Sequence, residues 1–300
     1  MQSPLVFCHY GNAAYLQYTL RCARRTNPDS RLVLLGDDEN KATARNAGWE
    51  HFDYRDFRSN RQDDFNSVYK PIQGRKHKRL HQFKGKKDWL KFVFERWYHI
   101  EGFVTENSFD RFWHFDSDTM ILRKLAGYER ALSRYDYTTQ CNAACLNGYV
   151  RTRLLTDYNA HTIGLFEDAQ FLDNQQREFD EKYPEYAFTE MRAFFEFTQN
   201  TDAKGLHLMT FSADEVFDDA LRQKHGFETV NYHKDEFVKD VRFNGDRITG
   251  MRDGREIAFV TLNMSWLPIL AYRWVFRALN GSKTALAKPL SSKIRRKYGF

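Results

Sequence analysis

Short apolar runs and stretches of helical periodicity alternate along the first part of the chain. The apolar runs cover residues 5–9, 31–36 and 49–54. Between the first two runs, apolar side chains recur every three or four residues, which predicts a helix that starts at an Asn12 N-cap and ends at Asn27-Pro28. A shorter helix is expected over residues 41–47. Strand, helix, strand, helix and strand at this spacing predict a parallel sheet flanked by helices.

The middle and the end of the chain continue the alternation. Residues 70–86 are expected to form a basic loop, and residues 89–100 a helix that is apolar on much of its circumference and therefore buried. A fourth strand is expected over residues 112–115. Further strands are expected over residues 119–122, 135–139, 143–150, 237–242, 248–252 and 256–261, and further helices over residues 154–165, 168–182 and 191–198.

Polar clusters follow three of the predicted strands, at His9–Asn12, Asp37-Asp38 and Asp116–Asp118. In doubly wound sheets, ligands bind beyond the carboxyl ends of the strands. The coincidence of three such clusters therefore predicts one binding site at this edge of the sheet.

Composition narrows the class of protein. The chain has 300 residues, enough for one large α/β domain or two small ones. Its mean hydropathy of −0.71 argues against a polytopic membrane protein, and residues 257–276 are interpreted as a strand followed by a helix. Residues 1–10 show no pattern of a secretory signal, so the four cysteines are expected to be reduced. Cys141-x-x-x-Cys145 lacks nearby partners for zinc.

The net charge of +6 is unevenly spread. Residues 70–91 hold nine lysines and arginines and one acid, and residues 257–300 hold eight basic residues and no acid. Two basic segments on an acidic body indicate anionic partners, such as phosphates or an anionic membrane surface. A solvated surface run remains the alternative for the first segment, and an unstructured tail for the second. No nucleic-acid partner is expected, because the chain has no signature of a nucleic-acid-binding module.

Asp116 and Asp118 flank Ser117 directly after an aromatic strand. A turn at Ser117 would bring both carboxylates near one ion, and hard oxygen ligands suit Mg²⁺ or Mn²⁺. Without a cation the two carboxylates would repel each other. The alternative is a plain turn at the end of the strand, because Asp-x-Asp alone is a weak pattern.

Three stretches carry a family resemblance: PLVFCHYGNAAYLQYTLRCARRTNPDSRLVLLGDD, the basic loop with its helix, and RFWHFDSDTMIL. Together they resemble the GT-A-fold glycosyltransferases that use nucleotide-diphosphate sugars. The likeness implies a GT-A, Rossmann-like α/β fold with a mixed, mainly parallel sheet. It implies a glycosyltransferase domain over residues 1–265, with a nucleotide-binding half over 1–122 and an acceptor half over 123–265. Residues 266–300 would then be a basic C-terminal helical extension.

The same resemblance implies a set of site residues. FDSDTMIL is similar to the family's DxD motif, so Asp116 and Asp118 would hold Mn²⁺ or Mg²⁺ on the donor diphosphate. Phe188-Thr189-Glu190-Met191 resembles an acidic step that opens a helix near the acceptor. The residues implied to contact the donor are Cys8, His9, Tyr10, Gly11, Asp37, Asp116, Ser117 and Asn142.

One position departs from the family pattern. Related enzymes often place a metal-binding histidine on a late strand, and here Asn263 stands at the comparable place. An amide carbonyl binds Mg²⁺ or Mn²⁺ more weakly than imidazole does, which leaves the third ligand, and with it metal dependence, open.

The expected reaction breaks the bond between the sugar C1 and the β-phosphate of a nucleotide-diphosphate donor, with a UDP-sugar favoured. Cations offset the charge that grows on the leaving diphosphate, and Lys87 is the candidate among the basic residues. Glu190 is the candidate base for the acceptor hydroxyl if the stereochemistry inverts; its alternative role is to favour the first turn of a helix. Inverting and retaining outcomes both stay open.

The acceptor is expected to be a hydroxyl of a glycan or of a lipid-linked sugar. The alternatives are a sugar-phosphate nucleotidyltransferase and a non-catalytic protein that binds anionic polymers. The first lacks the usual glycine-rich basic loop after the first strand, since only Tyr10-Gly11-Asn12 stands there. The expected location is the cytoplasm, with peripheral contact between the basic C-terminal segment and the inner face of the membrane as a further option.

Overall fold

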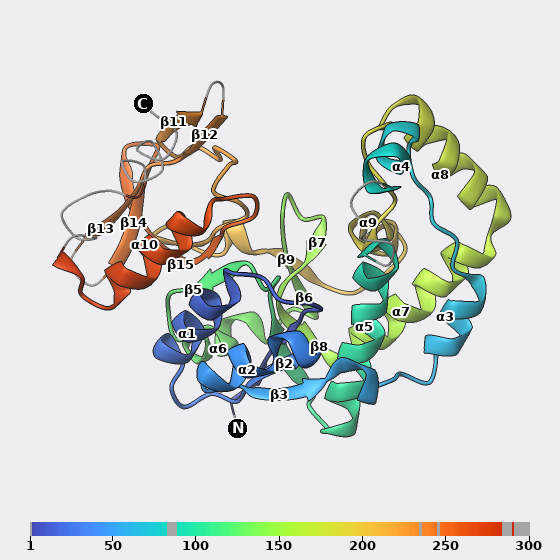
Figure 1. Ribbon diagram of the computed structural model, residues 1–300, viewed down its shortest axis with the longest axis horizontal. Helices are drawn as coiled ribbons and strands as arrows, with labels where there is room; N and C mark the ends of the chain where they lie inside the picture. Colours follow the sequence, from blue (N-terminus) through green and yellow to red (C-terminus); the bar gives the residue numbers. More distant parts are fainter. Residues whose placement is uncertain (1, 83–88, 234–235, 245–246, 284–289, 291–300) are drawn as a thin grey trace.

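The structure is a computed structural model, which describes residues 2–82, 89–233, 236–244, 247–283 and 290 (Figure 1). The apolar runs of the first half pair into a five-stranded sheet in the order β3-β2-β1-β4-β8. Its strands are β1 (Leu5–Cys8), β2 (Leu32–Gly36), β3 (Glu50–Asp53), β4 (Arg111–His114) and β8 (Gly148–Arg151). Strands β1 to β4 are parallel, and β8 is antiparallel to β4. The prediction of a mixed, mainly parallel α/β sheet is therefore confirmed.

Side chains of the central strands alternate between two buried faces, as parallel strands covered on both sides require. Leu5 and Phe7 of β1 belong to a core with α1 (Leu16–Thr26) and α2 (Asp38–Asn46). Val6 and Cys8 belong to the opposite core, which includes most of α5 (Trp89–Glu106). The helix predicted from residue 89 onward is thus buried, as its wide apolar surface indicated.

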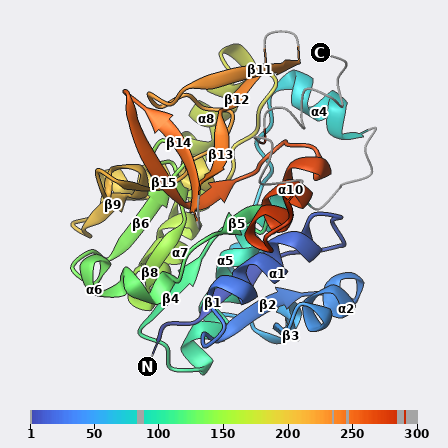
Figure 2. The ribbon, with the colours of Figure 1, turned by 90° about the vertical axis from the view of Figure 1, so that its left-hand side faces the viewer.

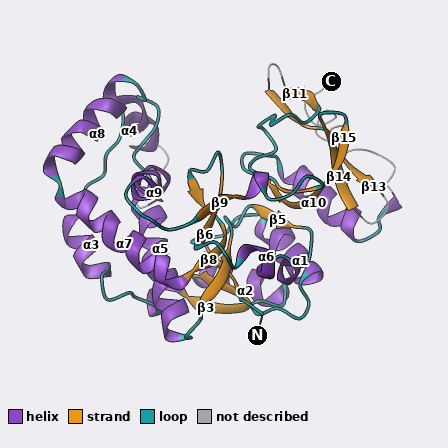
Figure 3. Cartoon of the chain, turned by 180° about the vertical axis from the view of Figure 1, so that it is seen from behind, coloured by secondary structure: helices purple, strands orange, loops and turns teal. Residues whose placement is uncertain are grey.

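A second sheet lies next to the first (Figure 3). It has the order β10-β15-β14-β13, and β5 pairs with β15. The bounds are β5 (Thr119–Ile121), β10 (Glu215–Phe217), β13 (Val241–Asn244), β14 (Arg247–Arg252) and β15 (Arg255–Asn263), with a small ladder of β11 (Thr229–His233) and β12 (Glu236–Lys239) beside them. Because β5 follows β4 after four residues, Asp116 and Asp118 lie where the chain passes from one sheet to the other.

The remaining elements lie mostly on the side of the central sheet that faces away from the second sheet (Figure 1). A three-stranded sheet has the order β7-β6-β9. The bounds are β6 (Tyr137–Gln140), β7 (Cys145–Leu146), β9 (Gly205–His207), α3 (Gln62–Val68), α4 (Arg75–Gln82), α6 (Glu129–Leu132), α7 (Thr152–Glu167), α8 (Ala169–Glu181) and α9 (Glu190–Gln199). Short 3₁₀ turns stand at Tyr54–Asp56, Leu125–Gly127 and Leu208–Thr210.

Two kinds of local prediction are wrong. Helix α1 has Tyr15 rather than Asn12 as its N-cap, because Gly11 at φ +71° is held by Asp37 and Asn40 and the helix starts only after a further turn. The strands expected over residues 143–150 and 237–242 are each divided, the first into β7 and β8 and the second into β12 and β13, which belong to different sheets. Both kinds of error arise from contacts with residues distant in the sequence.

The segment predicted as a basic loop over residues 70–86 contains helix α4 instead. The backbone N–H groups of Lys76 and His77, in the first turn of α4, donate to the carbonyl of Pro184. Arg75 and Lys76 form ion pairs with Asp180 and with Glu185, at 3.7 and 3.0 Å. This stabilisation comes from a segment more than 100 residues away, so the local sequence does not indicate it.

Residues 257–276 form the end of β15 and the start of α10 (Ile269–Leu279), as expected. Helix α10 lies beside α1 (Figure 2), and the Tyr15 and Tyr272 rings stack with centroids 5.3 Å apart. Within the described residues, no helix is both long and apolar enough to cross a membrane. The division of the chain at residue 265 stays a prediction, and most of residues 284–300 lie outside the description.

Candidate functional site

A cavity of about 710 Å³ opens at the carboxyl edge of the central sheet, where β1, β2 and β4 end. Asn142 and Asn263 are not among the residues that line it, and Lys87 lies outside the described residues. The strand ends and helix α9 bring the other predicted site residues together in its wall. These are Cys8, His9, Tyr10, Gly11, Asp37, Asp116, Ser117, Asp118 and Glu190.

The loop after β1 is held in place by the start of α2. Asp37 caps this helix by accepting from the backbone N–H of Glu39 at 3.0 Å, and its other oxygen accepts from the N–H of Gly11 at 2.5 Å. Asn40 donates to the carbonyls of His9 and Gly11, both at 3.0 Å. Asp37 therefore shapes the cavity wall through both of its oxygens, and its contact with a nucleoside stays a prediction.

Gly36 makes this arrangement possible. A Cβ atom at Gly36 would lie 2.0 Å from Oδ1 of Asn40 and 2.7 Å from Nε2 of His51. Both contacts are far shorter than van der Waals separation, so any side chain at this position would displace Asn40 from the β1 loop.

Ser117 lies between the two acidic residues and joins them to the β1 loop. Its hydroxyl is 2.9 Å from Nδ1 of His9 and 3.3 Å from the hydroxyl of Tyr15. The turn between β4 and β5 is closed by the N–H of Thr119, which donates to the carbonyl of Asp116 at 2.9 Å. The aspartates are thus held by backbone and side-chain bonds on a short, partly buried turn.

Arg96 is the site residue that the sequence analysis missed. It projects from α5, is buried, and forms ion pairs with Asp116 at 2.6 Å and with Glu190 at 2.9 Å. The sequence did hold a signal for this role, because Arg96 occupies a position of the apolar pattern in α5. A cation at a buried position needs an acidic partner. The two partners of Arg96 are 20 and 94 residues away in the sequence, so the pattern alone does not identify them.

The two aspartates differ in their electrostatic surroundings. Burial raises the pKa of Asp116, but the charge of Arg96, together with His114 and the hydrogen bonds from Arg96 and Asn147, holds the pKa below its usual value. Asp118 has no ion-pair partner among the described residues, so burial and then the charge of Asp116 raise its pKa to about 6. Two negative charges at this turn repel each other, and a cation placed between them would relieve the repulsion.

Glu190 begins helix α9 and faces the same guanidinium. Burial raises its pKa to about 7, although Arg96 acts in the opposite direction. A carboxyl group whose pKa is close to neutral can both accept and return a proton near physiological pH. The arrangement therefore suits a general acid–base role as well as a structural one.

Three polar atoms of the cavity wall are buried without a hydrogen-bond partner among the described residues. They are Oδ1 of Asp118, Nε of Arg96 and Oε2 of Glu190. Buried polar groups in native proteins are almost always satisfied, by water or a ligand where the protein offers nothing. Two acceptors and one donor in the wall of a single cavity indicate a polar ligand.

The residues present fit a divalent cation only in part. Asp118 offers its unpartnered Oδ1, and Oδ2 of Asp116 has weak contacts, at 3.5 Å to Asn147 and 3.7 Å to Cys145. Among the residues that the structure describes, no three His, Cys, Asp or Glu side chains form a metal-binding group. Two carboxylates nevertheless match Mg²⁺, which takes one or two carboxylates and completes its shell with water and substrate phosphates.

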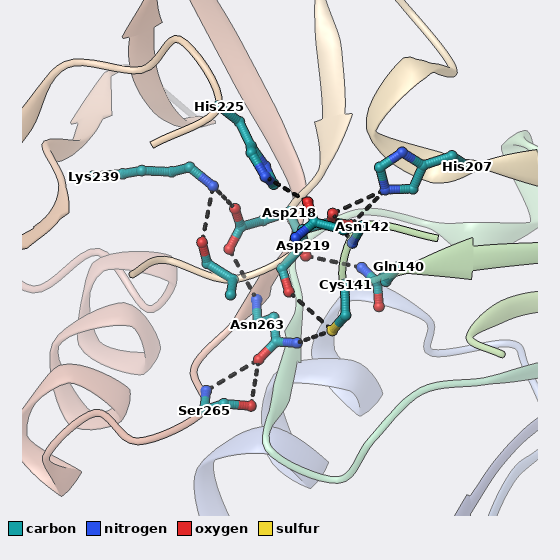
Figure 4. Close-up of polar contacts among 11 residues, drawn as sticks. Gln140, Cys141, Asn142, His207, Asp218, Asp219, His225, Lys239, Asn263 and Ser265 are labelled. Carbon is teal, nitrogen blue, oxygen red and sulfur yellow. Dashed lines mark hydrogen bonds and ion pairs between the residues drawn. The ribbon is translucent and has the colours of Figure 1, made fainter. Parts of the chain in front are cut away.

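Asn263, the predicted third ligand, is linked to Asp118 through the side chain of Ser265, and Figure 4 shows its contacts with Ser265. Its Oδ1 accepts from the N–H of Ser265 at 3.0 Å and lies 2.7 Å from the Ser265 hydroxyl. That hydroxyl is also 2.8 Å from Oδ2 of Asp118, and its single proton can serve only one of the two acceptors. Asn263 would reach an ion only after giving up Ser265, so its role as a ligand stays a prediction.

Asn142 belongs to a polar cluster around Asp219 that does not line the cavity (Figure 4). Its backbone N–H donates to Asp219 at 2.7 Å, and its side-chain oxygen is 3.0 Å from Nε2 of His225. Nε2 of His207 lies 2.9 and 3.0 Å from the two oxygens of the same buried Asp219. Cys141, Asn142 and Ala143 all have positive φ, so the turn after β6 is strained. A contact between Asn142 and a donor sugar stays a prediction.

No model of a known protein family matches the chain, and no curated protein matches it at significant similarity.

Proposed function

We propose that the protein is a glycosyltransferase that moves a sugar from a nucleotide-diphosphate donor, a UDP-sugar by preference, to a hydroxyl of a glycan or lipid-linked acceptor. The observation that carries the proposal is the cavity in which Arg96 forms ion pairs with Asp116 and Glu190, with Asp118 in the same wall, beside the loop that follows β1. The resemblance of FDSDTMIL to the DxD motif supports the same reading, and so does the position of the motif at the carboxyl end of β4.

The charge balance of the cavity bears on how an anionic donor would bind. The described lining of the cavity has five carboxyl groups, those of Asp37, Glu39, Asp116, Asp118 and Glu190, against a single arginine, Arg96, whose charge is shared between Asp116 and Glu190. A diphosphate would be repelled by this group unless a further cation accompanied it. Asp118 and Asp116 would hold Mg²⁺ or Mn²⁺, which supplies the charge that offsets the diphosphate. The GT-A fold, the metal ion and the role of Lys87 as a cation that offsets the charge of the leaving diphosphate are all parts of this proposal.

Glu190 is the group that would move the proton. In an inverting transfer the bond between the sugar C1 and the β-phosphate oxygen breaks, and a bond from the acceptor oxygen to C1 forms. The hydroxyl proton passes to the unpartnered Oε2 of Glu190, and the electron pair of the broken bond stays on the diphosphate. Arg96 holds Glu190 in place through its other oxygen. A retaining transfer would leave Glu190 with the positioning role alone.

The test is release of UDP, GDP or CMP from a panel of UDP-, GDP- and CMP-sugars, measured by chromatography with Mn²⁺, with Mg²⁺ and with chelator. We expect turnover of one nucleotide-diphosphate sugar that requires the metal and is lost in Asp118→Asn. The matched control is Asp202→Asn at an exposed position, which should keep full activity. Turnover that Asp118→Asn leaves intact would reject the proposed site.

The same assay addresses the alternative of a nucleotidyltransferase. Formation of a sugar nucleotide and pyrophosphate from a nucleoside triphosphate and a sugar 1-phosphate, with no release from preformed donors, would favour that reaction instead.

A further inference from the structure

A second cavity, of about 530 Å³, shares Tyr10 and Phe92 with the first. The centroids of these two rings lie 4.5 Å apart, so they form a common aromatic wall. Tyr10 follows β1, whereas Tyr54, in the second cavity, follows β3 at the edge of the sheet. The second cavity therefore extends the ligand-binding edge of the central sheet away from Asp116 and Asp118.

Aromatic rings line much of this second cavity. The Tyr54 ring lies 5.4 Å from that of Phe92 and 5.0 Å from the imidazole of His99, centroid to centroid. Rings at such distances offer flat faces and edges against which a planar heterocycle packs well. The walls suit a flat aromatic ligand more than a hydrated sugar.

Gln62 supplies a hydrogen-bond acceptor in the wall of this cavity. Nδ1 of His99 lies 2.8 Å from the carbonyl of Phe57, which can only accept, so Nδ1 carries the proton. Burial lowers the pKa of His99, which keeps the ring neutral and leaves Nε2 as an acceptor. The amide nitrogen of Gln62, 3.3 Å from that Nε2, is then the donor. The orientation of the Gln62 amide is thereby fixed.

The oxygen of the Gln62 amide has no hydrogen-bond partner among the described residues. Gln62 is only 5% exposed, and its Oε1 is buried without a hydrogen bond to any described residue. Leaving a buried acceptor unpaired costs about 1–3 kcal/mol. A ligand N–H that reaches Oε1 would recover this free energy.

The cations around the cavity are already neutralised by neighbouring acids. Lys91 pairs with Glu95 at 3.1 Å, Arg55 pairs with Asp53, and Arg58 pairs with Asp63. The cavity therefore has, in its described lining, no lysine or arginine that lacks an acidic partner. Its aromatic walls and buried acceptor favour an uncharged planar ring that carries an N–H group.

We propose that this second cavity binds the nucleobase of the donor, with the ring against the Tyr10 and Phe92 wall and a base N–H on Oε1 of Gln62. The inference rests on the proposed function, and it adds the residues that select the base. Ribose and diphosphate then lead past Tyr10 to the first cavity, where Arg96 and the acidic groups lie.

The first experiment uses the wild-type protein, titrated calorimetrically with UDP, GDP, CDP and ADP in the presence of Mn²⁺. We expect one base to bind best, by about tenfold or more over the weakest, because only one places an N–H on Gln62 without strain. Methylating that N–H, as in N3-methyl-UDP or N1-methyl-GDP, should weaken binding by about tenfold or more. Equal affinity of the methylated and parent nucleotides would overturn the inference.

The second experiment uses Gln62→Leu, which removes the acceptor at similar size. The affinities of Gln62→Leu for the four nucleotides should differ from one another by no more than a few-fold. The matched control is Gln17→Leu, at an exposed position whose side-chain amide donates to the Ala14 carbonyl. Gln17→Leu should keep the wild-type ranking.

The outcomes separate this inference from the proposed function. An unchanged ranking in folded Gln62→Leu, or no base preference in the wild type, overturns the inference and leaves the proposed function standing. Failure of the wild type to bind any nucleoside diphosphate rejects both. If Gln62→Leu does not fold, the methylated nucleotides decide the matter on the wild-type protein.

Discussion

Replacing Glu190 by glutamine tests the electrostatics of the cavity without a ligand. The folded protein holds the pKa of Glu190 at about 7 through burial, against an ordinary value of 4.5. Each pKa unit corresponds to about 1.4 kcal/mol, so ionising Glu190 in the folded state costs roughly 3 kcal/mol more than in the unfolded chain. Glutamine has nearly the same shape, keeps an oxygen for Arg96 and never ionises.

The direction in which the free energy of unfolding changes with pH follows from proton binding to Glu190. Between pH 4.5 and 7 the folded state holds a proton on Glu190 that the unfolded state has released, so stability falls as the pH rises through this window. The stabilising contribution is complete below pH 4.5 and lost above pH 7. The free energy of unfolding of Glu190→Gln, relative to wild type, should therefore increase by roughly 2–3 kcal/mol between pH 4.5 and 8.

Urea denaturation at several pH values, with chelator present, measures this difference. Glu196→Gln on the same helix, at the surface beside Arg192, corrects for the pH dependence of the rest of the molecule. A difference between wild type and Glu190→Gln that stays constant from pH 4.5 to 8 would refute the raised pKa, and with it the argument that Glu190 can exchange a proton near neutral pH.

Three further perturbations have defined outcomes. Lys239→Met should lower the free energy of unfolding by about 3–5 kcal/mol in urea, because Lys239 and Asp218 form a fully buried ion pair and Asp218 would lose its partner; an effect below 1 kcal/mol would contradict this. Gly36→Ala should cost about 1–3 kcal/mol and weaken nucleotide binding by displacing Asn40, whereas Gly127→Ala, with open space around its Cβ, should leave both unchanged. Deleting residues 281–300 should release the protein from anionic liposomes if the basic C-terminal segment binds them, and equal co-sedimentation would reject that prediction.

The sequence predicted the central sheet well because its signal is local. After Arg31, the run over residues 32–36 has no polar side chain, as strands buried on both faces require, and β2 forms there with all five residues buried. Antiparallel β8 and the short strands β9 and β10 were harder to place, since pairing partners fix them more than their own three or four residues do.

The sequence predicted those residues of the candidate site whose position follows from the order and direction of the strands. Asp37 and Asp116 follow parallel strands, and parallel strands bring their carboxyl ends to one edge. Arg96 and Gln62 were not predicted, because their importance lies in contacts with residues far away in the chain. Asn142 shows the opposite case: the family resemblance gave it a role, and the structure places it beside Asp219 and His225.

The most direct test of the central claim is a crystal structure of the protein grown with UDP and Mn²⁺. The account predicts a metal ion in contact with Asp118, the diphosphate between that ion and Arg96, and the base beyond Tyr10. Nucleotide bound elsewhere on the molecule, with Asp116 and Asp118 free of metal and phosphate, would contradict it.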